Sequence, residues 1–167
     1  IGSSVTSIGD HAFYPCNNLT TINYTGDIAS WCAISGLGNL TEYGSISKTL
    51  YIGGELIEGE LTIPDSVTSI TSNAFKYCCS GLTSVTIGNG VTSIGYNTFY
   101  YCGGLTSVTI GSSVTSIGER AFSYTNLTSI YFGGTKEQWN AISKGEDWDE
   151  ITGEYVIHCT DGDINKE

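Results

Sequence analysis

The stretch that decides the fold runs from residue 82 to residue 132 and reads LTSVTIGNGVTSIGYNTFYYCGGLTSVTIGSSVTSIGERAFSYTNLTSIYF. Its pattern returns after 23 residues, so that Val91 corresponds to Val114 and Phe99 corresponds to Phe122. A motif that recurs with a fixed period of roughly 20 to 50 residues is typical of solenoids and related arrays. The sequence therefore predicts a chain that winds into similar coils, each packed on its neighbours.

Each repeat contains two short segments of strand type, VTSIG and LTSVTI. Apolar residues alternate in both segments and β-branched residues are frequent, as expected for half-buried strands. Equivalent strands of successive coils should pair in parallel. The SIGxxAFxxC corner between the two segments is short, and we expect it to hold one turn of α or 3₁₀ helix. The predicted fold is a β-rich solenoid that forms a single domain over residues 1–167.

Two tryptophan segments, residues 24–60 and 131–164, separate or follow the repeats, which cover about 1–23, 61–87, 88–110 and 111–132. The two segments match each other at a shift of 108 residues, which aligns Trp31 with Trp139. We interpret each segment as an inserted module that contains a short helix followed by an antiparallel hairpin. The second module should cover the exposed end of the solenoid, because an open strand edge invites pairing with another chain.

The expected helices span residues 27–35 and 135–143. Asp27 and Thr135 are equivalent and are both favourable N-caps, and Thr135 with Gln138 fits a capping box. Two-residue turn signals predict the tips of the hairpins. These signals are Gly53-Gly54 and Asp161-Gly162.

Three of the six cysteines follow a repeat phenylalanine by three residues, namely Cys16, Cys78 and Cys102. A column of small residues suits the narrow interior corner of a solenoid, and free cysteine behaves as a small buried hydrophobe. We therefore predict buried, reduced thiols at these three positions. In the last repeat Thr125 takes the same place. The other three, Cys32, Cys79 and Cys159, fall outside the column and suggest no pairing, and the absence of a CxxC spacing argues against a zinc site.

Composition limits the classes of partner. The 167 residues carry a formal net charge of −11, which disfavours nucleic acid and anionic membrane surfaces. No run of 18 apolar residues is present, so the sequence predicts no membrane insertion. The chain contains no Met and starts within a repeat, from which we expect a processed or excised piece whose export signal and anchor lie outside this stretch.

The full motif VTSIGxxAFxxCxxLTSVTI, carried at residues 5–22, 67–87, 91–110 and 114–130, resembles the BspA-like (Treponema pallidum type) leucine-rich repeat. The tryptophan segments are similar to those that punctuate such arrays. The resemblance implies a curved, right-handed leucine-rich superhelix that is secreted from a bacterial cell or displayed on its surface. Some members are similar to adhesins that bind host matrix proteins, and the resemblance supplies no catalytic residues.

Catalytic chemistry finds little support in the residues. Charged side chains are rare in the repeats, whereas a polysaccharide-cleaving enzyme on a parallel β-solenoid needs carboxylates that converge in one groove. His158 and Cys159 are adjacent in an expected strand, and their side chains should point to opposite faces. The acidic stretch 146–167 does not fit a calcium-binding EF-hand loop, which favours solvated surface. We expect no cofactor and no metal.

Two functions remain. The favoured hypothesis is a monomeric, non-catalytic extracellular module for recognition or adhesion, which binds a protein or a glycan of a host or bacterial surface. The alternative is a structural spacer or stalk segment within a larger surface protein.

Two surfaces are candidates for binding. Tyrosines that follow the repeat phenylalanine by two residues should stack along one outer edge, about 4.8 Å apart, and tyrosine suits recognition surfaces. This column contains Tyr77, Tyr101 and Tyr124, with Tyr100 beside it. The competing interpretation is that these rings only seal the corner of the coil. The rival surface is the strand face, with Ser84, Thr86, Ser107, Thr109, Ser129 and Tyr131.

Overall fold

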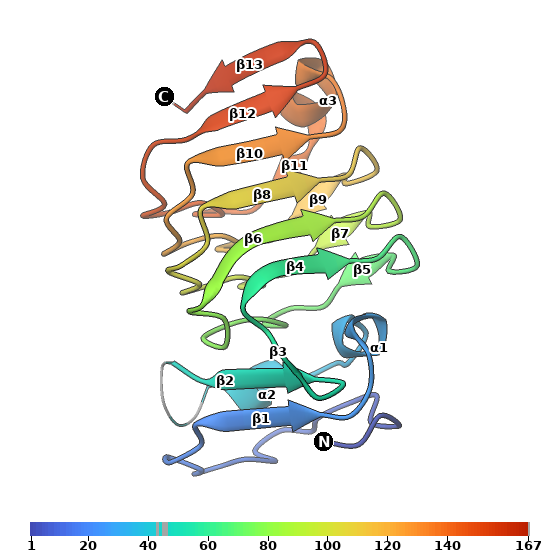
Figure 1. Cartoon of the computed structure of the whole chain (residues 1–167), viewed down its shortest axis with the longest axis vertical. Coiled ribbons are helices and arrows are strands. Elements are labelled where there is room, and N and C mark those ends of the chain that lie inside the picture. Colours follow the sequence, from blue (N-terminus) through green and yellow to red (C-terminus); the bar gives the residue numbers. More distant parts are fainter. Residues whose placement is uncertain (43, 45–46, 167) are drawn as a thin grey trace.

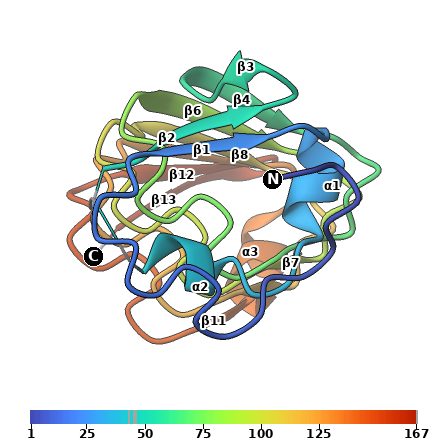
Figure 2. The same ribbon diagram turned by 90° about the horizontal axis from the view of Figure 1, so that it is seen from below.

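The chain winds into stacked coils that follow one another along the long axis of Figure 1. The computed structural model describes residues 1–42, 44 and 47–166, and six coils lie within this part of the chain. Each coil contains a short extended segment, a tight corner and a longer strand. Long and short strands therefore lie on opposite sides of a shared core (Figure 2). The coils cover residues 5–24, 34–52, 67–87, 91–110, 114–132 and 142–159.

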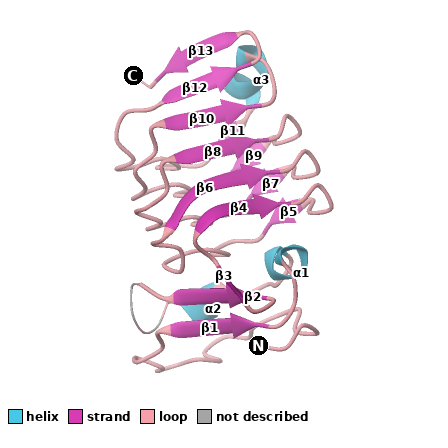
Figure 3. Cartoon of the chain, viewed as in Figure 1, coloured by secondary structure: helices cyan, strands magenta, loops and turns pink. Residues whose placement is uncertain are grey.

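The long strands of the last four coils form one sheet with two additional strands (Figure 3). Its order is β13-β12-β10-β8-β6-β4, and all pairs are parallel except β12 with β13. The register repeats the motif, since Val108 lies between Val85 and Ile130 and all three are buried. The strands are β4 (Gly59–Ile63), β6 (Leu82–Ile87), β8 (Ser107–Ile110), β10 (Ser129–Phe132), β12 (Val156–Cys159) and β13 (Gly162–Asn165).

The VTSIG segments form a second parallel sheet with the order β11-β9-β7-β5. Threonine side chains reinforce both ladders, because four hydroxyls donate to the carbonyl of the equivalent threonine one coil away. Thr92 donates to Thr68 at 3.0 Å, and Thr106 donates to Thr83 at 3.1 Å. The strands are β5 (Ser69–Ile70), β7 (Ser93–Ile94), β9 (Ser116–Ile117) and β11 (Ser143–Lys144).

The first two coils form a separate sheet of β1 (Thr21–Tyr24), β2 (Thr49–Ile52) and β3 (Glu55–Leu56), so the long sheet is interrupted between β3 and β4. A hydrogen bond from the indole bridges this interruption, since Trp31 Nε1 donates to Ala74 O at 2.9 Å. In the later coils the backbone N–H of Phe75 makes the equivalent bond to Thr98 O. Trp31 thus replaces a backbone donor where the regular stack is broken.

The core is continuous from the first coil to the sixth. Its centre is a stack of the repeat phenylalanines, in which the ring centroid of Phe99 lies 5.3 Å from those of Phe75 and Phe122. All three side chains are fully buried. Phe13 of the first coil is only partly buried, and Ala12 beside it is exposed, because no other coil among the described residues covers this corner.

The corners differ from the expected turn of helix, and consist of hydrogen-bonded turns throughout the last four coils. The reason is that two residues in each corner have positive φ, and a left-handed residue interrupts a right-handed helix. The pairs are Asn73 and Tyr77, Asn97 and Tyr101, Arg120 and Tyr124, and Asp147 and Ile151.

Both tryptophan segments contain the expected caps. Asp27 accepts a hydrogen bond from Ser30 N at the start of α1 (Ile28–Cys32), and Thr135 with Gln138 forms the capping box of α3 (Lys136–Ala141). The helices are shorter than the predicted 27–35 and 135–143, because Ser35 and Ser143 pair with the preceding coil instead. A further short helix, α2 (Gly38–Thr41), was not expected.

The hairpins agree with the sequence at one tip and differ at the other. Gly53 and Gly54 link β2 to β3 as predicted, whereas the second turn is Thr160-Asp161, one residue before the predicted Asp161-Gly162. In both hairpins the first strand also continues the parallel stack, since β2 pairs with β1 and β12 pairs with β10. The second tryptophan segment is therefore attached to the last repeat, as predicted.

The prediction of a column of buried cysteines is correct in part. Cys78 and Cys102 are buried, and so is Thr125, but Cys16 is exposed and that prediction is wrong. Cys16 belongs to the corner of the first coil, which no other described coil covers. Cys32 and Cys79 are also buried, and all six cysteines, which lie within the described residues, have free thiols.

Thiol labelling of the native protein at mildly alkaline pH should therefore be fastest at Cys16. Burial raises the pKa of Cys32 and of Cys78 to about 12, so their reactive thiolate is rare. We expect these two to react with Ellman's reagent only after unfolding. Mass mapping of the labelled sites checks this result, and rapid labelling of Cys78 in the folded protein would contradict it.

Candidate functional site

The four predicted tyrosines form one cluster on the corner side of coils three to five. Five pairs among these rings have centroids 4.5–5.6 Å apart, and the rings of Tyr101 and Tyr124 are stacked at 4.5 Å and 12°. Tyr101 is 40% exposed, and the other three are partly buried. The four rings are therefore neither fully buried in the core nor fully exposed to solvent. We call Tyr77, Tyr100, Tyr101 and Tyr124 the tyrosine cluster.

Two lysines border the tyrosine cluster. The ammonium of Lys76 lies 5.2 Å from the ring centroid of Tyr77 and 5.9 Å from that of Tyr100, and Lys48 lies 5.8 Å from Tyr77. Such distances allow cation–π attraction. Burial, followed by neighbouring tyrosines, raises the pKa of Tyr77 and of Tyr100. Their phenols are thus neutral at physiological pH and can donate hydrogen bonds.

The left-handed backbone explains how the corner presents these rings. Tyr77, Tyr101 and Tyr124 have φ values of 60°, 63° and 59°, which is uncommon for residues with large side chains. The corner backbone is held by bonds to the next coil, including Tyr77 N to Tyr100 O at 3.1 Å. The coil geometry, rather than any preference of tyrosine, determines where the rings point.

The strand-face residues align across the long sheet in two columns. Ser84, Ser107 and Ser129 share one register, and Thr86, Thr109 and Tyr131 share the other. The serines are partly buried, whereas the members of the second column are exposed. The second column continues to His158 of β12, which pairs with Tyr131.

His158 extends the aromatic surface at this end of the sheet. Its ring stacks on Tyr131 with centroids 4.8 Å apart and an angle of 20°, while its Nδ1 lies 2.9 Å from Asp163 Oδ1. The sequence alone indicates no binding role for His158. The strand VIHC lacks the LTSVTI pattern, so its register with β10 was not visible in the repeat.

The acidic stretch has a structural use that the sequence did not reveal, because residues 145–154 form the corner of the sixth coil. Phe122 N donates to Trp148 O, and Asp149 accepts from Tyr155 Oη at 2.6 Å and pairs with Lys166 at 3.1 Å. Among the described residues, no three His, Cys, Asp or Glu side chains are grouped so that they could hold a metal ion. None of the helices in the same residues has the length and apolar character that a membrane span requires.

These features define a non-globular repeat architecture, a parallel β-solenoid of the leucine-rich-repeat class. A family model described as "BspA type Leucine rich repeat region" matches residues 1–43 and 45–144 in six copies. The chain belongs to this family. The match extends into both tryptophan segments, where the sequence had suggested inserts. Neither a curated protein nor a solved structure gave a significant match.

Membership has general consequences for function. The family is generally non-catalytic and is typically associated with bacterial surfaces, where it suggests recognition or adhesion.

Proposed function

We propose that this protein is a non-catalytic extracellular recognition module, and that the tyrosine cluster binds a surface protein or a glycan of a host or a bacterium. The observation that carries the proposal is the partly exposed cluster of four contacting rings. Aromatic rings that combine an apolar face with a hydroxyl dominate many recognition surfaces. The two strand-face columns, of which the second ends in Tyr131 and His158, form the second candidate surface of the same module.

We infer a secreted or surface-displayed monomer that is wound as a right-handed superhelix, in which the two tryptophan segments are equivalent helix–hairpin modules. Support for equivalent modules comes from the matching caps at Asp27 and Thr135, from the buried Trp31 and Trp139, and from the hairpins that follow.

Replacing three tyrosines tests the proposal. Asparagine tolerates positive φ better than other non-glycine residues, so the triple variant Tyr77→Asn, Tyr101→Asn, Tyr124→Asn should fold. We expect it to lose binding to a target found on an array of matrix proteins and glycans. The loss should be about 30-fold or more, since one aromatic hot spot contributes at least ~2 kcal/mol. Surface plasmon resonance measures the affinity.

Tyr14→Asn is the matched control, because Tyr14 is 61% exposed and lies outside the tyrosine cluster. It should leave the affinity unchanged. Equal losses in both variants, or a triple variant that unfolds, would contradict the tyrosine site.

The alternative function is a structural spacer. The continuous core and the threonine ladders favour it, because they would stiffen the stack of coils that follows β4. A folded protein that binds nothing on the arrays would support the spacer.

A further inference from the structure

The interruption of the long sheet leaves one edge of β4 without a partner strand. Ile63 O accepts from Gly88 N and Gly59 N donates to Gly81 O, so alternate residues of β4 face β6. The backbone N–H and C=O groups of Glu60 and Thr62 consequently face the opposite side, where β4 has no neighbour in its sheet. Outside the strand ladders, none of the backbone hydrogen bonds of the described residues involves these groups. Such an edge can accept an extended chain.

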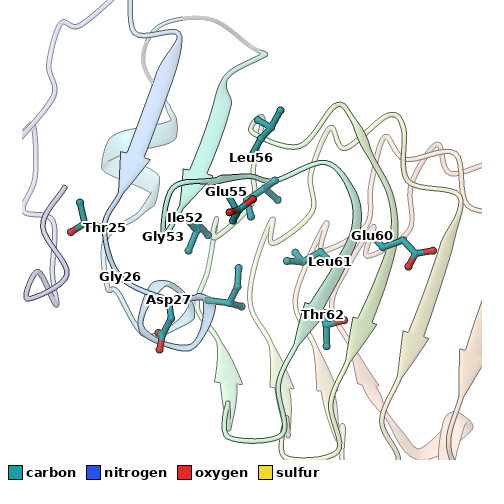
Figure 4. Close-up of a pocket in the computed structure, with 12 residues that line it drawn as sticks. Thr25, Gly26, Asp27, Ile52, Gly53, Glu55, Leu56, Glu60, Leu61 and Thr62 are labelled. Atoms are coloured by element: carbon teal, nitrogen blue, oxygen red, sulfur yellow. The ribbon is translucent and has the colours of Figure 1, made fainter.

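A groove lies along this free edge and separates it from the hairpin of the first sheet (Figure 4). Its volume is about 620 Å³, within the range of roughly 300–1,000 Å³ that is usual for ligand sites. The start of α1 lines one side with Ile28, β3 contributes Leu56, and β4 contributes Leu61. Leu56 is 37% exposed, so apolar surface remains open to a ligand.

The charge of the groove has one sign. Asp27, Glu55 and Glu60 line it, and no basic residue is found among its described lining residues. Hydrogen bonds from Ser30 to Asp27 lower the pKa of Asp27, which keeps this carboxylate ionised. Acidic walls beside an unpaired strand edge complement a cationic extended chain and repel an acidic one.

We propose that the groove between β3 and β4 is a docking site for an extended basic peptide segment of a partner protein, which adds to β4 as a further strand. The backbone of the peptide exchanges hydrogen bonds with Glu60 and Thr62. Its side chains alternate, so that apolar residues contact Leu56 and Leu61 while lysine or arginine residues approach Glu55 and Glu60. This site is separate from the tyrosine cluster, and its failure leaves the test of that cluster unaffected.

Fluorescence anisotropy with synthetic peptides tests the proposal. A labelled peptide of alternating lysine and valine should bind at low salt, and its counterpart of alternating glutamate and valine should not. N-methylation of every second backbone nitrogen removes the donors of one strand edge. Methylating the set of nitrogens that faces β4 should weaken binding about tenfold or more, through the loss of the two bonds to Glu60 O and Thr62 O. Methylating the alternate set should leave binding unchanged. Equal effects of methylating the two sets, or equal binding of the acidic peptide, would overturn the proposal.

Protein variants locate the site. The double variant Glu55→Gln, Glu60→Gln should weaken binding of the lysine–valine peptide about fivefold, as expected for two exposed charge pairs. The control Glu146→Gln, Glu154→Gln changes the net charge equally on exposed residues of the sixth coil and should have no effect. Equal weakening in the two variants would show that only the overall charge matters.

Blocking the edge gives an independent result. Proline lacks the N–H group and is tolerated on edge strands, so Thr62→Pro should abolish peptide binding in a protein that keeps its melting temperature. If this variant does not fold, the amide chemical shifts of the unmodified protein, measured by NMR, locate the binding site instead. Titration with the peptide should move the amide resonances of Glu60 and Thr62 at the lowest peptide concentrations. Changes confined to the resonances of other strands would disprove docking at β4.

Discussion

Replacing Trp31 with alanine is expected to lower the free energy of unfolding by about 3–5 kcal/mol, the usual range for a buried large aromatic side chain. Trp31 is fully buried, contacts Tyr24 with ring centroids 5.4 Å apart, and donates its indole N–H to Ala74 O. The substitution therefore removes packing between α1 and β1 and a hydrogen bond to the third coil. Urea denaturation followed by circular dichroism measures the change.

Trp31→Phe separates the two contributions. Phenylalanine retains much of the apolar contact but has no donor, which leaves the buried carbonyl of Ala74 without the indole. A loss of about 1–3 kcal/mol is expected for such an unpaired group. If Trp31→Phe were as stable as the parent protein, the bond across the sheet interruption would contribute nothing to stability.

Phe99→Ala is the second substitution with a large expected effect. The Phe99 ring is stacked between Phe75 and Phe122 at 5.3 Å on both sides, and its side chain has no exposed surface. Removing it opens a cavity between two coils and should cost about 3–5 kcal/mol. Equilibrium unfolding in urea gives the value.

The repeat provides its own control for this substitution. Phe13 occupies the same motif position in the first coil but is only partly buried, so Phe13→Ala should cost clearly less than Phe99→Ala. Equal costs would mean that burial in the stack does not determine the stability of the repeat phenylalanines.

The regular part of the fold was predictable because one pattern fixes both strand type and register. The 23-residue spacing of Val91 and Val114 places equivalent strands side by side, and alternation of apolar residues fixes which side chains are buried. Helix caps were equally visible, since the Thr135–Gln138 capping box depends on residues three positions apart.

The corners and the sixth coil were not predictable for a different reason, because their structure is imposed by neighbouring coils. Arg120 has positive φ, although nothing in its residue type favours that conformation. In the short sheet Lys144 occupies the position equivalent to Ile117. The pattern of apolar residues is therefore broken in the sixth coil, and the repeat cannot be recognised there from the sequence.

The candidate site was predictable in part. The residues of the tyrosine column were identified from their spacing, and the structure brings all four rings into contact. Their partial burial, the nearby Lys48 and Lys76, and the extension of the strand face to His158 depend on packing between coils. No local sequence signal records such packing.

The interruption between β3 and β4 also has a mechanical consequence. Elsewhere in the stack, tension along the long axis would be shared by parallel strand ladders on two sides of the core. Between the second and third coils the long-sheet ladder is absent, and the described backbone and indole bonds that cross are those of Cys32 with Thr71, Lys48 with Tyr77, and Trp31 with Ala74. A protein pulled from its two ends would yield first at this joint, and each side would keep its own folded coils. The array thus consists of two stiff blocks joined by a weaker seam.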